Sequence, residues 1–187
     1  MKQIAVVGTG YVGLVTGTCF AETGNRVTCI DIDAQKVEKM KQGQIPIYEP
    51  ELDVLFERNI KAGRLHFTTD LAAGIQDAEI IFLALPTPPG EDGSADLSYI
   101  LGVADQLGKL LTDYKVIIDK STVPVGTAER VHAAIASHAK VPFAVVSNPE
   151  FLREGYAVAD FMKPDRVVIG CSDERANHDA VWLHEVS

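Results

Sequence analysis

Three glycines near the start of the chain have the spacing of a phosphate-binding turn. Gly8, Gly10 and Gly13 form a Gly-x-Gly-x-x-Gly string directly after an apolar run that ends at Val7. This pattern is typical of a buried strand that turns tightly into a helix, where backbone N–H groups can bind a pyrophosphate. The same string also occurs as a packing turn in proteins that bind other ligands or none, so its meaning depends on the residues after it.

Asp31 supplies the second part of a dinucleotide site. It ends an expected strand over 27–31 and lies about twenty residues beyond the glycines, where a carboxylate accepts hydrogen bonds from the ribose hydroxyls of adenosine. This spacing favours NAD over NADP. Asp31 could instead cap the next helix, although Asp33 is better placed to do so. Lys36 is equally consistent with a charge beside the adenosine and with a solvated helix face.

Hydroxyl side chains follow two later strands. Thr87 lies between prolines after the fourth expected strand, where the second half of a dinucleotide would lie. We therefore expect it to contact the cofactor, although Pro-rich turns are often purely structural. Ser121 and Thr122 follow the strand expected over 115–119. They could cap a helix whose first turn holds Pro124, orient a water or a sugar, or do both.

Two glutamates follow the sixth expected strand. Glu150 and Glu154 are four residues apart and would share one face if the segment is helical. A carboxylate pair at the end of a strand is a candidate for general acid–base work. Arg153 could make the group a surface ion pair of little consequence. The Asn148–Pro149 turn before the glutamates favours the active-site interpretation.

Alternating strands and helices must position these residues. Apolar runs predict strands over 2–7, 27–31, 64–68, 79–85, 115–119, 143–147 and 166–170. Helical patterns occupy 13–24, 33–43, 55–60, the segment after Asp70, 97–111, 131–135 and 174–186. The prolines of 45–52 predict a loop, and 90–94 predicts a flexible polar loop.

This alternation predicts an α/β fold, a doubly wound and mostly parallel sheet of Rossmann type with right-handed crossovers. Ligands of such sheets bind beyond the carboxyl ends of the strands. We therefore expect the loops that carry the candidate residues to converge on one cleft.

Composition narrows the functional classes. The chain has 187 residues, 47% of them hydrophobic, and a formal net charge of −9, which argues against binding to a nucleic-acid backbone. No apolar stretch has the length of a membrane span, and the start predicts a strand rather than a signal segment, so we expect a cytoplasmic protein. Cys19, Cys29 and Cys171 lack the spacing of a metal site and are expected to be reduced. The five histidines fall in no motif.

Several motifs together have a familiar order. They are the glycine turn 8–13, the loop 45–50, and the segments 120–127, 148–155 and 164–167. With them the chain closely resembles the UDP-glucose/GDP-mannose dehydrogenase family, in its UDP-glucose dehydrogenase branch. The resemblance covers essentially the whole chain and implies an NAD-dependent enzyme. Such an enzyme oxidises C6 of UDP-glucose to the carboxylate of UDP-glucuronate, reducing two NAD⁺ by way of a thioester on a cysteine.

The resemblance also implies roles for individual residues. Contacts to NAD would come from Gly8, Gly10, Tyr11, Val12, Gly13, Asp31, Lys36, Thr87, Ser121, Thr122 and Glu154. The sugar nucleotide would lie along Glu150, Phe151, Leu152, Arg153 and Glu154. Glu150 would act in thioester hydrolysis, as a base or by positioning water with the help of Thr122, and Glu154 would lie where the nicotinamide meets the sugar.

Two departures from the family pattern shape the expectation. Pro86 precedes Thr87, where the family more often has a small or polar residue. The nucleophilic cysteine, the catalytic lysine and the uridine-binding domain of the family lie beyond Ser187, and none of the three cysteines here occupies a matching motif.

Residues 1–187 are therefore expected to be the NAD-binding domain of a longer, homodimeric enzyme, able to bind NAD weakly but not to turn over. Alternatives are GDP-mannose or UDP-N-acetylmannosamine as the substrate of the same family, or a non-catalytic NAD-binding module.

Overall fold

The structure is a computed structural model that describes residues 1–90 and 93–185, without the side chain of Glu185. Part of the expected loop 90–94, and Val186 of the expected last helix, lie outside the described residues.

A parallel sheet of six strands forms the centre of the molecule, in the order β3-β2-β1-β4-β5-β6. Its strands are β1 (Gln3–Val7), β2 (Arg26–Ile30), β3 (Leu65–Thr68), β4 (Ile80–Leu83), β5 (Lys115–Asp119) and β6 (Phe143–Ser147). From β1 the chain first adds β2 and β3 on one side of the sheet. It then returns to the other side of β1 and adds β4, β5 and β6. The strand order thus reverses between the paired strands β1 and β4, and ligands of doubly wound sheets bind beyond the carboxyl ends of the strands at such a topological switch point. The predicted fold class is confirmed.

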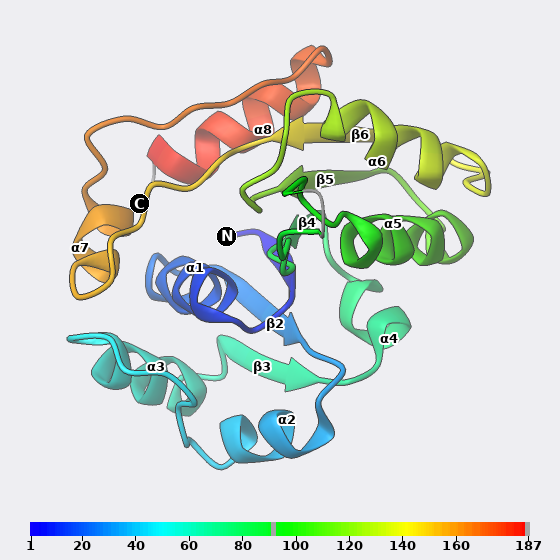
Figure 1. Cartoon of the computed structure of the whole chain (residues 1–187). Helices are drawn as coiled ribbons and strands as arrows, with labels where there is room; N and C mark the ends of the chain where they lie inside the picture. Colours follow the sequence, from blue (N-terminus) through cyan, green and yellow to red (C-terminus); the bar gives the residue numbers. More distant parts are fainter. Residues whose placement is uncertain (91–92, 186–187) are drawn as a thin grey trace.

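Helices cover both faces of the sheet (Figure 1). One layer contains α1 (Tyr11–Glu22), α2 (Ala34–Lys41), α3 (Leu52–Lys61), α7 (Ala157–Met162) and α8 (Glu174–Glu185). The other contains α4 (Leu71–Ile75), α5 (Ser98–Leu110) and α6 (Thr127–Ala136). The central strands have apolar side chains on both faces, because both faces are buried under helices. Over residues 1–90 and 93–185, no helix is both long enough and apolar enough to span a membrane.

Two aspartates start helices as predicted. The Asp33 carboxylate accepts hydrogen bonds from the backbone N–H groups of Gln35 and Lys36 at the start of α2. The Asp70 carboxylate accepts one from Ala73 at the start of α4. Because Asp33 caps α2, Asp31 is free to face the carboxyl edge of the sheet. The three cysteines are free thiols, as expected.

The strand predicted over 166–170 is wrong. Only Gly170 pairs with the sheet, in an isolated antiparallel bridge to Ser147 at the end of β6. The carbonyl of Val168 accepts its hydrogen bond from the Asn148 side chain instead, at 2.9 Å. The Val168 carbonyl is therefore bonded to a side chain and not to the backbone of a neighbouring strand.

Candidate functional site

The loops beyond the carboxyl ends of the strands line two cavities rather than the single expected cleft. The first, which we call the switch-point pocket, has a volume of about 880 Å³ and is lined by residues that follow β1, β2, β3, β4 and β5 and by part of α5. The second, the β6 pocket, has a volume of about 780 Å³ and is lined by 148–153, by 163–167 and by parts of α7 and α8. Glu150 lines both cavities.

The glycines of the first turn have different physical roles. Gly8 has a φ of 97°, and a Cβ there would lie 2.2 Å from the carbonyl oxygen of Ala84 on the neighbouring strand end. A Cβ on Gly13 would lie 1.9 Å from the carbonyl oxygen of Gly8. A Cβ on Gly10 would have no such neighbour within 4 Å, although Gly10 lines the switch-point pocket. The outer glycines thus permit close packing, and Gly10 leaves bare backbone open to a ligand.

The helix that begins at this turn presents its positive end to the same pocket. No side chain caps α1 at Gly10, and its first turn has no acidic residue. The first N–H groups of a helix have no partners within the helix and form the positive end of its dipole. Tyr11 and Val12 line the pocket beside Gly10. An anion is the ligand that such a helix end favours.

Asp31 lies at the other end of this pocket in a dense set of donors. Its Oδ2 accepts hydrogen bonds from the Thr9 backbone N–H at 3.1 Å, from the Thr9 hydroxyl, and from Lys36 Nζ at 3.0 Å. Burial raises the pKa of the carboxyl, but the donors of Thr9, the backbone N–H of Asp33 and Lys36 outweigh it and hold the pKa below its ordinary value. Lys36 also lines the pocket. Its side chain thus faces the pocket and Asp31 rather than solvent alone.

The hydroxyl residues connect the loops after β4 and β5. The Thr87 hydroxyl donates to the carbonyl oxygen of Thr122 at 3.1 Å. The Ser121 hydroxyl accepts from the Leu85 N–H at 3.1 Å. All three hydroxyl residues line the switch-point pocket. The suggested helix cap at Ser121 and Thr122 is wrong, because α6 starts only at Thr127, after Pro124.

The segment after β6 is not helical, so the condition under which Glu150 and Glu154 would share one face is not met. Residues 148–153 are irregular and 154–156 form a turn. The Glu150 carboxylate accepts from the Leu152 N–H at 2.5 Å, and Gly155 has a φ of 87°. Glu154 is exposed and lines neither cavity.

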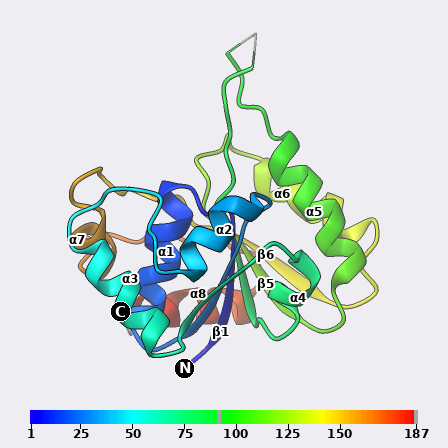
Figure 2. The ribbon, with the colours of Figure 1, turned by 90° about the horizontal axis from the view of Figure 1, so that it is seen from below.

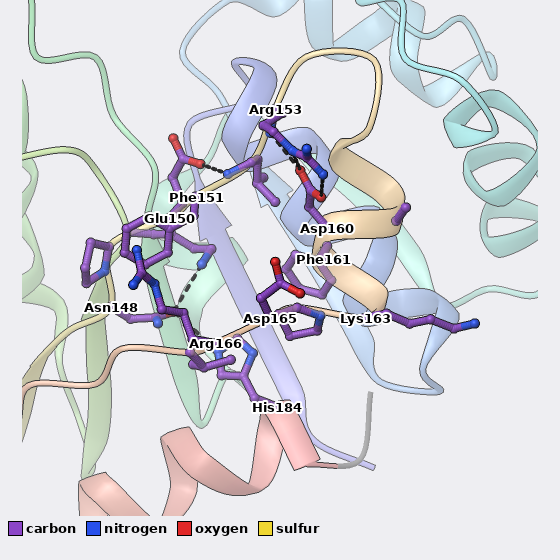
Figure 3. Close-up of a pocket in the computed structure, with 16 residues that line it drawn as sticks. Asn148, Glu150, Phe151, Arg153, Asp160, Phe161, Lys163, Asp165, Arg166 and His184 are labelled. Atoms are coloured by element: carbon purple, nitrogen blue, oxygen red, sulfur yellow. Dashed lines mark hydrogen bonds and ion pairs between the residues drawn. The ribbon is translucent and has the colours of Figure 1, made fainter.

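Side chains of this segment line the β6 pocket, together with residues from α7 and the chain that follows. Phe151, Leu152 and Arg153 line it. Arg153 forms an ion pair of 2.7 Å with Asp160 of α7 rather than with either glutamate (Figure 3).

A buried polar cluster at the far end of this pocket had no predicted role. Lys120 is 4% exposed, and its Nζ donates to Asn148 Oδ1 at 3.1 Å. His184 Nε2 lies 3.3 Å from the same oxygen, at the end of the pocket opposite Arg153 (Figure 3). Burial lowers the pKa of Lys120 to about 8. Burial and the Lys120 charge lower that of His184 to about 4. Lys120 and Asn148 both directly follow a buried strand, which is the signal that could have marked them.

Comparison with known proteins places this architecture in a family. Residues 2–186 match the sequence profile of the UDP-glucose/GDP-mannose dehydrogenase family, NAD binding domain. The chain belongs to this family. The resemblance seen in the motifs is thus confirmed, and NAD is the cofactor of the domain.

Individual members of the family are similar over nearly the whole chain. A UDP-glucose 6-dehydrogenase of Pseudomonas aeruginosa is 51% identical, over 97% of this chain and 41% of its own length. The structure of a UDP-glucose dehydrogenase from Pyrobaculum islandicum has a TM-score of 0.96 and 42% identity, covering 99% of this chain and 44% of that protein. A GDP-mannose dehydrogenase of Pseudomonas aeruginosa has a TM-score of 0.90 and 32% identity, over 99% and 44%. The chain thus spans less than half the length of these relatives.

The switch-point pocket fits the family's cofactor. NAD has a pyrophosphate near its middle and vicinal hydroxyls on its adenosine ribose. The open backbone at Gly10 and the uncapped start of α1 suit the first of these groups. The ionised Asp31 suits the second, because a carboxylate accepts hydrogen bonds from hydroxyls. These complementary features lie in one cavity.

Proposed function

We propose that this chain holds NAD in the switch-point pocket and serves as the cofactor-binding half of an NAD-dependent, homodimeric UDP-glucose 6-dehydrogenase. The observation that carries the proposal is the position of Asp31 and the bare Gly10 backbone in one cavity beyond β1 and β2. The relatives named for this activity support the choice of substrate. Two NAD⁺, bound one after the other, would each accept one hydride in an oxidation that removes four electrons from C6 of the sugar.

In this proposal the cofactor-binding residues divide by position. The turn shaped by Gly8 and Gly13, with the first backbone N–H groups of α1 at Tyr11 and Val12, holds the pyrophosphate. Asp31 accepts the ribose hydroxyls, and Thr9, the Asp33 N–H and Lys36 together keep the pKa of its carboxyl low. Residues from the loops after β4 and β5 border the nicotinamide half, and these are Thr87, Ser121 and Thr122.

We place the sugar nucleotide in the β6 pocket, along Phe151, Leu152 and Arg153. Glu150 is the residue best placed to act between the two ligands, because it lines both cavities. With Thr122 it would position or deprotonate the water that hydrolyses an acyl intermediate. Glu154 lines neither cavity. Its proposed role is therefore limited to that of a residue in the segment beside the sugar.

The nucleophilic cysteine is proposed to lie outside residues 1–187. Cys19 and Cys29 are buried in the core, where burial raises the pKa of each thiol to about 12. A nucleophilic cysteine instead needs a lowered pKa and access to substrate. Cys171 lines neither the switch-point pocket nor the β6 pocket.

Calorimetric titration of NAD into the chain tests the cofactor assignment. Asp31→Ala removes the acceptor of the ribose hydroxyls, and we expect the dissociation constant to rise by about 10- to 100-fold, because hydrogen bonds to a charged group contribute about 1.5–3 kcal/mol each. Asp77→Ala, at an exposed aspartate outside both pockets, should bind like the wild type. Unchanged affinity in Asp31→Ala, with an intact fold by circular dichroism, would remove the ribose assignment.

Titration of sugar nucleotides into the NAD complex of the full-length parent protein, which would include the uridine-binding domain, tests the substrate. UDP-glucose should bind more tightly than GDP-mannose or UDP-N-acetylmannosamine. Preference for GDP-mannose would favour the activity for which the relative with 32% identity is named. Binding of NAD without any sugar nucleotide would favour a non-catalytic module. Steady NADH formation from UDP-glucose by the chain alone would contradict the proposed place of the nucleophile.

A further inference from the structure

A buried carboxylate outside both pockets joins three separate parts of the chain. Glu49 belongs to the Pro-rich loop before α3 and is 4% exposed. Its Oε2 accepts hydrogen bonds from the Tyr11 hydroxyl and from the Gly155 N–H, the latter at 2.8 Å. Its Oε1 accepts from the Ala157 N–H at 2.9 Å. Glu49 thus links the first residue of α1 to the turn before α7 and to the first residue of α7.

The electrostatics of Glu49 are unusual for a buried acid. Within residues 1–90 and 93–185, no lysine, arginine or histidine forms a salt bridge with it. Burying a charge is costly unless it is paired or hydrogen-bonded. Burial raises the pKa of this carboxyl, but the donors of Tyr11, Gly155 and Ala157 outweigh it and keep the pKa below its ordinary value. The charge therefore depends on these neutral donors staying in place.

The backbone around Glu49 is itself constrained. Glu51, two residues later, has a φ of 68°, and it is the only residue other than glycine with a positive φ in the described part of the chain. This region is unfavourable for a glutamate, and such outliers persist where the surrounding structure fixes them. The loop before α3 lies beside α1 and α7 in both views (Figures 1 and 2). The observed loop conformation thus directs Glu49 inward, toward α1 and α7.

The hydrogen-bond partners of Glu49 lie in, or directly follow, chain segments that line the two pockets. Tyr11 lines the switch-point pocket. On the other side, Gly155 and Ala157 end the segment that begins at Glu150, and 150–153 line the β6 pocket. The Tyr11 hydroxyl also lies 3.4 Å from the carbonyl oxygen of Arg153 in this segment. A shift of α1 at its first turn would therefore be passed to the segment through one carboxylate.

We propose that Glu49 is a positioning residue that fixes segment 150–157 against the first turn of α1, so that NAD in the switch-point pocket steadies the wall of the β6 pocket. This inference rests on the proposed function. It adds a coupling between the cofactor and the residues that would face the sugar nucleotide. Coupling of this kind is reciprocal, so a ligand of the β6 pocket would also raise the affinity for NAD.

Amide hydrogen exchange, measured residue by residue with and without NAD, tests the coupling. In the wild type, saturating NAD should slow exchange of the Gly155 and Ala157 amides by about fivefold or more. Tyr11→Phe removes only the hydroxyl and leaves Glu49 its two backbone donors. With NAD added to saturation, at a concentration set from the variant's own dissociation constant by calorimetry, we expect this variant to lose the slowing at both amides.

Tyr48→Phe is the matched control, because it makes the same chemical change beside Glu49 at a side chain that is 88% exposed. It should keep the full effect of NAD. Glu49→Gln places an amide NH₂ against backbone donors and should speed exchange at both amides even without NAD, while β1 and β5 stay protected. Unfolding of this variant would leave Tyr11→Phe as the deciding test.

The outcomes separate the two proposals. If NAD binds the wild type but does not slow these amides, or if Tyr11→Phe keeps the slowing, the coupling is overturned and the cofactor assignment stands. If NAD does not bind the wild type, the proposed function and the coupling fail together.

Discussion

The two pockets that share Glu150 are built in different ways. The switch-point pocket rests on the ends of five neighbouring strands, and its key ligand groups are backbone N–H groups and one carboxylate at the end of β2. The β6 pocket has walls of irregular chain, joined by side-chain contacts such as Arg153–Asp160 and Lys120–Asn148 (Figure 3). The sheet therefore fixes the first pocket, whereas individual side chains hold the second in shape.

This difference has a functional meaning under the proposed activity. A site on the strands suits a cofactor that must bind in one geometry, because strand ends and helix starts barely move relative to each other. A site made of loops can adjust to its ligand and can be steadied from outside by a residue such as Glu49. Substitutions should accordingly disrupt the first pocket through backbone packing and the second through local loosening.

The largest effect is expected where backbone packing defines the switch-point pocket. Gly13→Ala would place a Cβ 1.9 Å from the carbonyl oxygen of Gly8, which cannot move aside as a flexible side chain could. We expect a loss of about 3 kcal/mol or more in the free energy of unfolding, measured by urea denaturation.

Gly10→Ala is the matched substitution, three residues earlier in the motif. Its Cβ would meet no heavy atom within 4 Å beyond its chain neighbours and would stand in the pocket. Stability should stay within about 0.5 kcal/mol of the wild type, while the dissociation constant for NAD rises by about tenfold or more. Equal losses of stability in both variants would contradict the division of roles among the glycines.

Asp119 lies where the chain divides between the pockets, since Lys120 after it lines the β6 pocket and Ser121 the switch-point pocket. It is 1% exposed, and its Oδ2 has no hydrogen-bond partner within the described part of the chain. Burial raises its pKa from 3.8 to about 6. The folded state therefore holds the proton of Asp119 more tightly than the unfolded chain does. Its contribution to stability is present below pH 3.8 and is lost as the pH rises through about 6.

Asp119→Asn removes this titration. Relative to the variant, the wild type should be more stable at pH 4 than at pH 8, by up to about 3 kcal/mol, as urea denaturation at the two pH values would show. Asp77→Asn, the same substitution at an exposed position, is the matched control. If the difference between wild type and Asp119→Asn is the same at both pH values, the Asp119 carboxyl is not in the environment described.

The contrast between the pocket built on strand ends and the pocket held by side chains also explains what could be predicted from the sequence. The sheet, the caps at Asp33 and Asp70 and the position of Asp31 follow from local patterns, because strand periodicity and capping chemistry act over a few residues. The spacing of Glu150 and Glu154 would place them on one face only in a helix, whereas Gly155 and the bond from the Leu152 N–H to the Glu150 carboxylate favour a turn.

Longer connections have no local signal. Glu49 and Gly155 are 106 positions apart in the chain, so no spacing rule links them. His184 joins the Lys120 cluster only because α8 packs against that end of the β6 pocket. Charge and burial decide such contacts after the fold has formed.

The smallest effect is expected at the exposed ion pair of the β6 pocket. The Arg153 side chain is 70% exposed, so water and salt screen its attraction to Asp160. Arg153→Ala removes the guanidinium bonds but keeps the backbone N–H of residue 153, which donates to Asp160 Oδ2 at 3.0 Å. We expect an unchanged midpoint in urea and unchanged amide exchange at residue 153.

Asp160→Ala removes the acceptor of both kinds of bond and should speed exchange of that amide, although the strands stay protected. The comparison thus separates the backbone bond from the charge. If Arg153→Ala speeds the exchange as much as Asp160→Ala, the guanidinium rather than the backbone bond holds this wall. The conformation of this pocket wall would then depend on salt concentration, because salt screens the ion pair. In high salt the residue 153 amide of the wild type should then exchange faster, as it does in Arg153→Ala.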